Sequence, residues 1–185
     1  MEICYKYAII RKRMEEIILI KKSLYKLQIS NLHLIETVRS FILENKEKFT
    51  DRSWDCNIHT SKNKFKNILY EVEEFKYIKN TLEEEIKNFL KKPFMLCESW
   101  INILNENGYQ EFHNHEEKKE TRKIGSGCLY FTKENSKIEF IFFQESVRHQ
   151  EIPKEGEILL FDSNVYHRVV DSKKERISLA FNFIY

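Results

Sequence analysis

The sequence has 185 residues, of which 42% are hydrophobic and 14% aromatic, so the chain can bury a full core as one domain spanning residues 1–185. The formal net charge is only +2, and basic and acidic residues are interspersed, which argues against a nucleic-acid footprint. The longest aliphatic run, residues 17–20, is far shorter than the ~20 apolar residues that a membrane span needs, so we expect no membrane association.

The four cysteines are dispersed along the chain, without a C-x-x-C pair. They are Cys4, Cys56, Cys97 and Cys128. The N-terminal stretch "IIRKRMEEIILIKK" is charged throughout and does not resemble a signal peptide. We therefore expect reduced thiols and a cytoplasmic protein.

The first predicted element is an amphipathic helix over residues 31–49. Its apolar residues lie three or four positions apart, and Ser30 or Asn31 is available as the N-cap. Residues 54–60 then alternate apolar and polar, which predicts one early strand.

Residues 64–92 repeat apolar side chains at helical spacing until Pro93, which predicts one long helix or two in succession. We expect the region of about 1–92 to be a helical support with that single early strand. No repeat or Gly/Ser linker marks a second domain.

After Pro93 the pattern changes to short segments rich in Ile, Phe, Tyr and Val, separated by turn residues. The predicted strands are residues 94–104, 109–113, 127–132, 137–143, 157–161, 166–171 and 176–185. Seven strands without an intervening helical pattern predict a β-sandwich or barrel over about 93–185, with the helices packed on its outer face.

Three histidines are candidate metal ligands. On a strand, His113 and His115 project to the same face and can chelate one ion, although a pair of solvated or hydrogen-bonded histidines fits the same pattern. His167 opens a later strand, and in an antiparallel barrel it can face the pair. The other histidines are expected to be structural or solvated. His33 lies on a helix, His59 on the outward phase of its strand and His149 in a charged loop.

The last strand has a polar face and a bulky face. The polar face carries Arg176, Ser178, Ala180 and Asn182, and Ile177, Leu179, Phe181 and Phe183 lie on the other. If the bulky face packs against the helices, the polar face lines the barrel interior. A buried guanidinium needs an anion, which a nearby Glu or Asp could supply, or a ligand carboxylate held by Arg176 and Ser178.

The order H-x-H, a histidine about fifty residues later, and R-x-S nine residues after that resembles the Fe(II)/2-oxoglutarate-dependent oxygenases. More narrowly, "SWINILNENGYQEFHNH", "SGCLYF", "PKEGEILLFDSNVYHRV" and "RISLAFNF" resemble a bacterial and phage group of these proteins that carries H-x-H. The likeness runs from about residue 24 to the end. It implies an α+β, mainly β fold: a double-stranded β-helix (jelly-roll) core with N-terminal helices on its outer face.

The resemblance also implies site residues. His113, His115 and His167 would bind Fe(II), and Arg176 and Ser178 would take the distal carboxylate of 2-oxoglutarate. Asn102 and Tyr130 would contact the cosubstrate, and Asn182 would belong to the pocket. The implied activity is a dioxygenase that uses O2 to oxidise an unidentified prime substrate while 2-oxoglutarate is decarboxylated to succinate.

The chain departs from the broad family at His115, where most members have Asp. The third ligand is then an imidazole, unless Glu111, Glu116 or Glu117 supplies a carboxylate. Charged loops at 116–124 and 144–151 are expected to rim the pocket mouth.

A metal-dependent cupin is the alternative, either an enzyme or a small-ligand binding protein that does not use 2-oxoglutarate. Its two motifs would comprise Gly108, His113, His115 and Glu120, then Pro153, Gly156 and His167. Arg176 and Ser178 discriminate, because a cupin has no general need for R-x-S. A third interpretation, an interaction protein whose histidines have no metal role, requires all these features to align by chance.

Overall fold

The computed structural model describes residues 2–9, 18–54, 57–115, 124–133, 136–142, 147–170 and 172–185. The strands are β1 (Glu2–Ile9), β2 (Ile18–Gln28), β3 (Asp51–Trp54), β4 (Ile58–Thr60), β5 (Met95–Leu104), β6 (Gln110–His113), β7 (Ile124–Tyr130), β8 (Ile138–Phe142), β9 (Val147–Glu151), β10 (Glu157–Asp162), β11 (Tyr166–Val169) and β12 (Arg176–Ile184). The helices are α1 (Leu32–Glu44), α2 (Lys46–Phe49), α3 (Ile68–Glu71), a 3-10 turn (Glu73–Phe75) and α4 (Lys76–Leu90).

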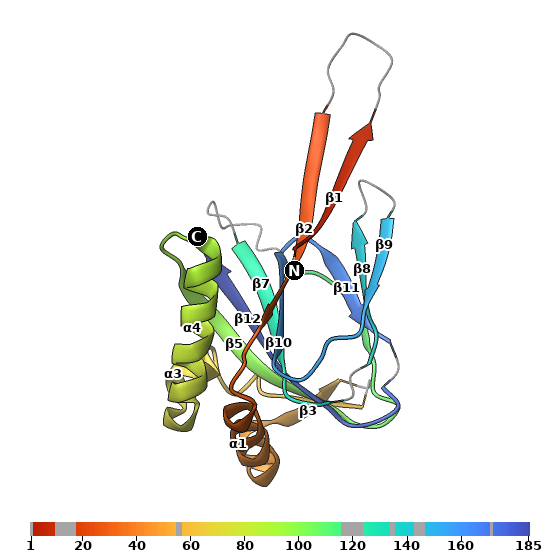
Figure 1. Ribbon diagram of the computed structural model, residues 1–185. Coiled ribbons are helices and arrows are strands. Elements are labelled where there is room, and N and C mark those ends of the chain that lie inside the picture. The colour runs from red at the N-terminus through yellow and green to blue at the C-terminus, as the bar shows by residue number, and fades with distance from the viewer. Residues whose placement is uncertain are drawn as a thin grey trace.

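Two antiparallel sheets form the body of the molecule (Figure 1). The larger sheet has the order β1-β2-β10-β7-β12-β5-β4-β3, and the smaller has the order β6-β11-β8-β9. Side chains from both sheets meet in one apolar cluster. For example, Tyr130, Leu159 and Phe161 of the larger sheet pack with Phe140 and Phe142 of the smaller. The sheets therefore face each other, and the space between them is the interior.

β12 lies in the middle of the larger sheet, paired with β5 and β7, and all nine of its residues are buried. Its bulky residues join the core on the helix side, as predicted. These residues are Ile177, Leu179, Phe181 and Phe183. Arg176, Ser178 and Ala180 line a pocket on the opposite side of the sheet, so the prediction of a polar face toward the interior is also confirmed.

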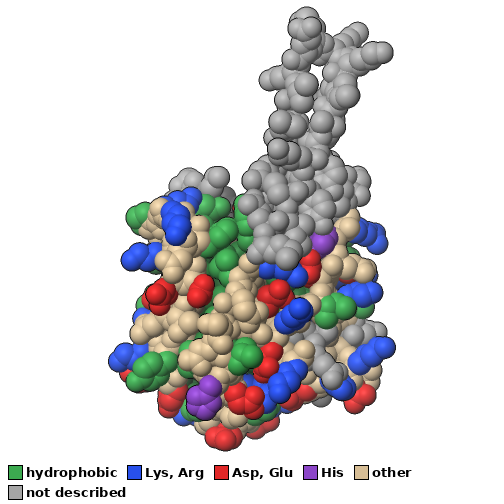
Figure 2. Space-filling view, in the orientation of Figure 1, with side chains coloured by type: hydrophobic (Ala, Val, Ile, Leu, Met, Phe, Trp, Pro, Cys, Tyr) green, Lys and Arg blue, Asp and Glu red, His purple; other side chains and the backbone are tan. Residues whose placement is uncertain are grey.

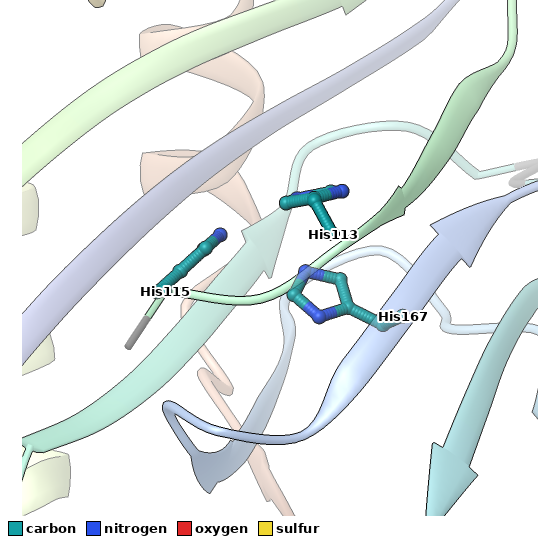
Figure 3. A group of neighbouring side chains, drawn as sticks. All are labelled: His113, His115 and His167. Atoms are coloured by element: carbon teal, nitrogen blue, oxygen red, sulfur yellow. The ribbon is translucent and has the colours of Figure 1, made fainter. Parts of the chain in front are cut away.

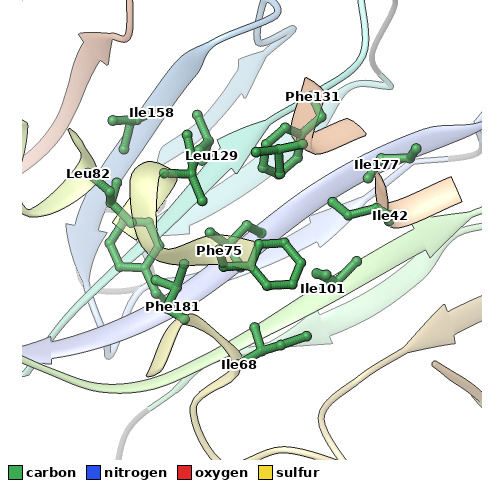
Figure 4. Close-up of a cluster of buried hydrophobic side chains, with 14 of the residues drawn as sticks. Ile42, Ile68, Phe75, Leu82, Ile101, Leu129, Phe131, Ile158, Ile177 and Phe181 are labelled. Carbon is green, nitrogen blue, oxygen red and sulfur yellow. The ribbon is translucent and has the colours of Figure 1, made fainter. Parts of the chain in front are cut away.

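The helices cover the outer face of the larger sheet (Figures 1 and 4). Asn31 caps α1 by accepting a hydrogen bond from the backbone N–H of Leu34 at 3.1 Å. α4 ends at Leu90, and the following cap residue, Lys91, has a left-handed φ of 55°. Along α4 the fully buried residues Ile78, Leu82 and Ile86 recur at four-residue steps and pack on the sheet, since one apolar stripe faces the core.

The N-terminal region contains strands as well as helices, so the prediction of a helical region 1–92 with one strand is wrong in two places. β1 and β2 form a hairpin that extends beyond the body of the molecule, and β2 pairs with β10 (Figure 1). The predicted strand at 54–60 is instead β3 and β4, two short strands paired with each other. The helix predicted at 31–49 is interrupted at Asn45, between α1 and α2.

Lys, Arg, Asp and Glu are interspersed over the coloured surface in Figure 2, as the sequence predicts. None of the described helices is long and apolar enough to cross a membrane. The predicted loop at 144–151 is partly β9, and residues 144–146 lie outside the described part of the chain.

Candidate metal centre

A pocket lies between the two sheets and takes its lining from both. Its polar lining residues are Asn102, Gln110, His113, His115, Cys128, Tyr130, His167, Arg176 and Ser178. Its apolar lining includes Trp100, Ile138, Phe140, Phe161 and Val169. Among the described residues, no Asp or Glu lines it.

Three imidazoles converge at this pocket (Figure 3). One ring nitrogen from each of His113, His115 and His167 lies within 4.8 Å of the others. The ring centroids are 4.3 Å apart for His113 and His167, 5.1 Å for His115 and His167, and 5.3 Å for His113 and His115. The structure thus brings together the three histidines that the sequence selected.

A β-bulge places His113 toward the interior. His113 pairs with His167 and Gln110 pairs with Val169, so three steps along β6 match two along β11. Because of this extra residue, both Gln110 and His113 line the pocket although they lie three positions apart. Phe112 lies under the Arg168 guanidinium, 4.6 Å from the ring centroid.

His115 lies just beyond the end of β6, not on a strand with His113. Its backbone N–H donates to the Ser163 carbonyl at 2.8 Å, which fastens it to the turn between β10 and β11. Val165 lies two residues after Ser163 and directly precedes β11, which carries His167. The same turn therefore positions two of the three imidazoles.

The hydrogen bonds of the three rings orient them alike. His113 Nδ1 lies 2.8 Å from the Glu111 carbonyl, and His167 Nδ1 lies 3.1 Å from the Val165 carbonyl. His115 Nδ1 lies 3.0 Å from Asn182 Oδ1. Each acceptor requires the proton on Nδ1, so each Nε2 keeps its lone pair for another partner.

Burial keeps the three rings neutral. It lowers the pKa of His115 to about 3, with the neighbouring His113 ring adding to the effect. Burial also lowers the pKa of His113, and it lowers the pKa of His167 well below its usual value. Three neutral imidazoles with free Nε2 lone pairs form a donor set for a divalent transition metal.

Arg176 lies at the opposite end of the pocket. The register of β5, β12 and β7 aligns their inward-facing residues in layers across the sheet. From the Arg176 end, the layers are Leu104 with Arg176; Asn102, Ser178 and Tyr130; Trp100, Ala180 and Cys128; and Glu98, Asn182 and Ser126. His115 belongs to the last layer because it contacts Asn182 and Ser126. Ser178 and Tyr130 therefore lie between the guanidinium and the histidines.

The Arg176 side chain is 2% exposed, and its Nε and Nη1 atoms have no hydrogen-bond partner. Its guanidinium carbon lies 5.1 Å from the centroid of the Tyr130 ring. A buried cation with two unsatisfied donors is costly, and aromatic contact alone does not satisfy N–H groups. This end of the pocket is therefore built for an anion.

Two residues predicted for the pocket, Asn102 and Asn182, form hydrogen bonds within the protein. With its amide assigned from its neighbours, Asn102 donates to Thr60 Oγ1 at 2.9 Å and accepts from Trp100 Nε1 at 3.3 Å. Asn182 contacts His115 and Glu98 and is not among the pocket-lining residues. Sequence analysis placed Asn182 on the correct face of β12 but could not foresee its partners, which belong to other strands.

The other histidines lie apart from this cluster. His33 is on α1 and His59 on β4. His149 is on β9, not in a loop, and its Nε2 lies 2.6 Å from Glu151. Glu111 is exposed and contributes only its backbone carbonyl to His113. Within the described residues no carboxylate joins the cluster, whereas Glu116, Glu117 and Glu120 lie outside them.

The sequence matches no protein-family model and no curated protein. A prolyl-4-hydroxylase from Pseudomonas putida matches the structure with a TM-score of 0.64 at 16% identity, over 87% of this chain and 91% of that chain. A prolyl hydroxylase from Trichoplax adhaerens, solved with a fragment of hypoxia inducible factor, gives 0.66 at 11% identity over 88% and 83%. HygX from Streptomyces hygroscopicus, with nickel, 2-oxoglutarate and hygromycin B bound, gives 0.64 at 10% identity over 87% and 82%.

These three matches each cover most of both chains, so they show a shared fold. The fold of this chain is the double-stranded β-helix. The predicted fold class is therefore confirmed: mainly β, with helices on the outer face of one sheet.

Proposed function

We propose that the protein is an Fe(II)- and 2-oxoglutarate-dependent dioxygenase. The observation that carries this proposal is a single pocket with three converging imidazoles at one end and a buried guanidinium without an anion at the other. A metal-binding module that does not use a keto acid has no need for the second feature.

His113, His115 and His167 would hold the metal through Nε2, and three protein ligands leave positions open for small molecules. Bound there, Fe(II) supplies the chemistry that couples decarboxylation of 2-oxoglutarate to succinate and CO2 with oxidation of a substrate by O2. The aromatic walls, including Phe140 and Phe161 against His167, exclude bulk water from the imidazoles.

Arg176 would bind the distal carboxylate of 2-oxoglutarate, because its buried guanidinium has two donors, Nε and Nη1, without a partner, and a guanidinium forms charge-assisted hydrogen bonds with a carboxylate. Ser178 lies two residues nearer the histidines on the same face of β12, and its hydroxyl can donate to the same carboxylate. The keto acid would thus span the layers between Arg176 and the metal.

Neighbouring structures agree with this cosubstrate but not with one prime substrate. HygX was solved with nickel, 2-oxoglutarate and hygromycin B, and the Trichoplax enzyme with a peptide fragment. The pocket of this chain therefore supports the cosubstrate site, and its prime substrate is left open. Membership of the narrower bacterial and phage group and a cytoplasmic location stay predictions from the sequence.

The test is anaerobic reconstitution with Fe(II) followed by 2-oxoglutarate. We expect the weak visible absorption band of a keto acid bound to Fe(II), and we expect it to disappear in His113→Ala, His115→Ala and His167→Ala. His33→Ala is the matched control, because this histidine is exposed on α1. Metal binding without any response to 2-oxoglutarate would favour the cupin alternative, and equal metal binding by wild type and His167→Ala would overturn the metal site.

A further inference from the structure

A chain of hydrogen bonds connects His115 to a carboxylate on β5. His115 Nδ1 lies 3.0 Å from Asn182 Oδ1 and 3.1 Å from Ser126 Oγ. Ser126 Oγ donates to the same Asn182 oxygen at 2.8 Å. Asn182 Nδ2 then donates to Glu98 Oε2 at 2.9 Å. Among the described residues, the Nδ1 atoms of the other two imidazoles meet backbone carbonyls and not a side chain.

The order of donors along this chain has one solution. The Glu98 carboxylate only accepts, so the Asn182 amide must turn its NH2 toward Glu98 and its oxygen toward His115. That oxygen can only accept, so His115 carries its proton on Nδ1. Glu98 thereby fixes both the amide orientation of Asn182 and the tautomer of His115.

These hydrogen bonds also transmit the electrostatic effect of the Glu98 carboxylate to His115. Hydrogen bonds in series polarise one another, and a carboxylate behind a ligating histidine raises the basicity of that ligand. Asn182 and Ser126 are 5% and 0% exposed, so little water competes along the path. The metal cluster itself contains no carboxylate among the described residues, and Glu98 stands one amide away from it.

We infer that Asn182 and Glu98 are positioning residues that make His115 an electron-rich metal ligand and replace, at a distance, the charge of a carboxylate ligand. This inference rests on the proposed metal site. It differs from the sequence-based prediction for Asn182, because the residue acts through His115 and does not line the pocket.

The deciding variant is Glu98→Gln, which preserves the shape of the side chain and an acceptor oxygen but removes the charge. We expect it to weaken Co(II) and Fe(II) binding several-fold. We also expect it to raise the Fe(III)/Fe(II) midpoint potential, because loss of a nearby negative charge destabilises Fe(III) more than Fe(II). Asn182→Leu, which breaks the path, should weaken metal binding by about 10–100-fold.

Glu111→Gln is the matched control. Glu111 is an exposed carboxylate two residues from His113, and only its backbone carbonyl accepts from that ring. The substitution removes the same charge near a different ligand without breaking a hydrogen bond to it. A general effect of removing a carboxylate near the histidines would shift the potential in both variants, whereas the hydrogen-bond path through Asn182 predicts a shift in Glu98→Gln alone.

Anaerobic metal titration and spectroelectrochemistry measure these quantities without turnover. The proposed effect of Glu98 on His115 would be overturned if Glu98→Gln left the midpoint potential and the metal affinity unchanged, or if Glu111→Gln changed them equally. If that effect is overturned but His115→Ala still loses the metal, the metal site stands. If His115→Ala keeps full metal affinity, the proposed function itself fails.

Discussion

Arg176 is a charged residue that is only 2% exposed. Its Nε and Nη1 are buried without partners, and no described carboxylate lines its pocket. Desolvated charges of this kind are tolerated where a ligand completes them. We therefore expect the residue to destabilise the ligand-free protein and, under the proposed function, to contribute to 2-oxoglutarate affinity.

Arg176→Met tests both effects. Replacing the unsatisfied guanidinium with an apolar side chain of similar length should raise the free energy of unfolding of the metal-free protein by about 1–3 kcal/mol, measured by urea denaturation. The same variant should lose 2-oxoglutarate affinity by about thirty-fold to several thousand-fold, because truncating one partner of a buried charge pair costs roughly 2–5 kcal/mol. Titration calorimetry of the anaerobic Mn(II) form measures that loss.

Arg168→Met is the control for Arg176→Met. Arg168 Nε donates to Glu139 at 2.6 Å, so its removal leaves a largely buried carboxylate without this partner. Stability should fall and 2-oxoglutarate affinity should be unchanged. A destabilised Arg176→Met protein with normal 2-oxoglutarate affinity would contradict the role given to Arg176.

His115→Asp introduces the residue that most of the oxygenases resembled by this sequence have at this position, but the surroundings oppose it. Glu98 holds the Asn182 amide with its oxygen toward position 115, so a new carboxylate there would meet an acceptor. We expect His115→Asp to bind Fe(II) more weakly than wild type. The double variant His115→Asp/Glu98→Gln should recover part of that affinity, because the Asn182 amide can then turn its NH2 group toward position 115. Anaerobic Fe(II) titration of both variants checks this, and identical affinities would argue against the fixed amide.

At the scale of elements, α4 and β12 hold the outer core together. Leu82 of α4 is fully buried in the cluster that includes Phe181 and Leu129 (Figure 4). Leu82→Ala should lower the free energy of unfolding by about 2–5 kcal/mol through lost burial and the cavity that remains. Tyr77→Ala, on the same helix but 75% exposed, should change it by about 0.5 kcal/mol or less. Similar losses of unfolding free energy in the two variants would contradict the assignment of Leu82 to the core.

Local sequence patterns predicted the elements whose period is uninterrupted. The alternation in β12 gave the correct inward set, including Arg176 and Ser178, and helical spacing gave Ile78, Leu82 and Ile86 of α4. The same alternation exists at Ile3, Tyr5 and Tyr7, yet the charged residues around it obscured the β1–β2 hairpin.

Features that depend on distant partners were not predictable. The bulge in β6 becomes visible only from its pairing with β11, and it explains why Gln110 and His113 both face the pocket. Likewise, the contact of Asn182 with Glu98 and His115 joins three separate segments. A single sequence specifies which residues are polar on a face, but not which of their neighbours will satisfy them.

At the scale of the whole molecule, ligand binding should stabilise the fold. The histidines and Arg176 come from both sheets, so metal and 2-oxoglutarate together would link β6, β11 and β12. At about 100 times Kd a ligand contributes about 2.7 kcal/mol, which for a chain of this size raises Tm by roughly 5–11 °C. Anaerobic thermal unfolding with Mn(II) and 2-oxoglutarate measures it. In Arg176→Met, Mn(II) alone should still raise Tm, and the same concentration of 2-oxoglutarate should add at most about 1 kcal/mol.

The position of β12 also decides when the protein can fold during its synthesis. In the part of the chain that the structure describes, β12 follows every other strand in sequence, yet it lies between β5 and β7 and carries Arg176. Until residues 176–184 emerge from the ribosome, β5 and β7 have no partner on their shared side, and the nascent chain exposes two unpaired edges. The larger sheet must therefore close after translation of this last strand, in a slow step dominated by contacts between distant residues. Loading of the metal and the keto acid would follow that closure, and a nascent chain that stalls before β12 would be a target for chaperones.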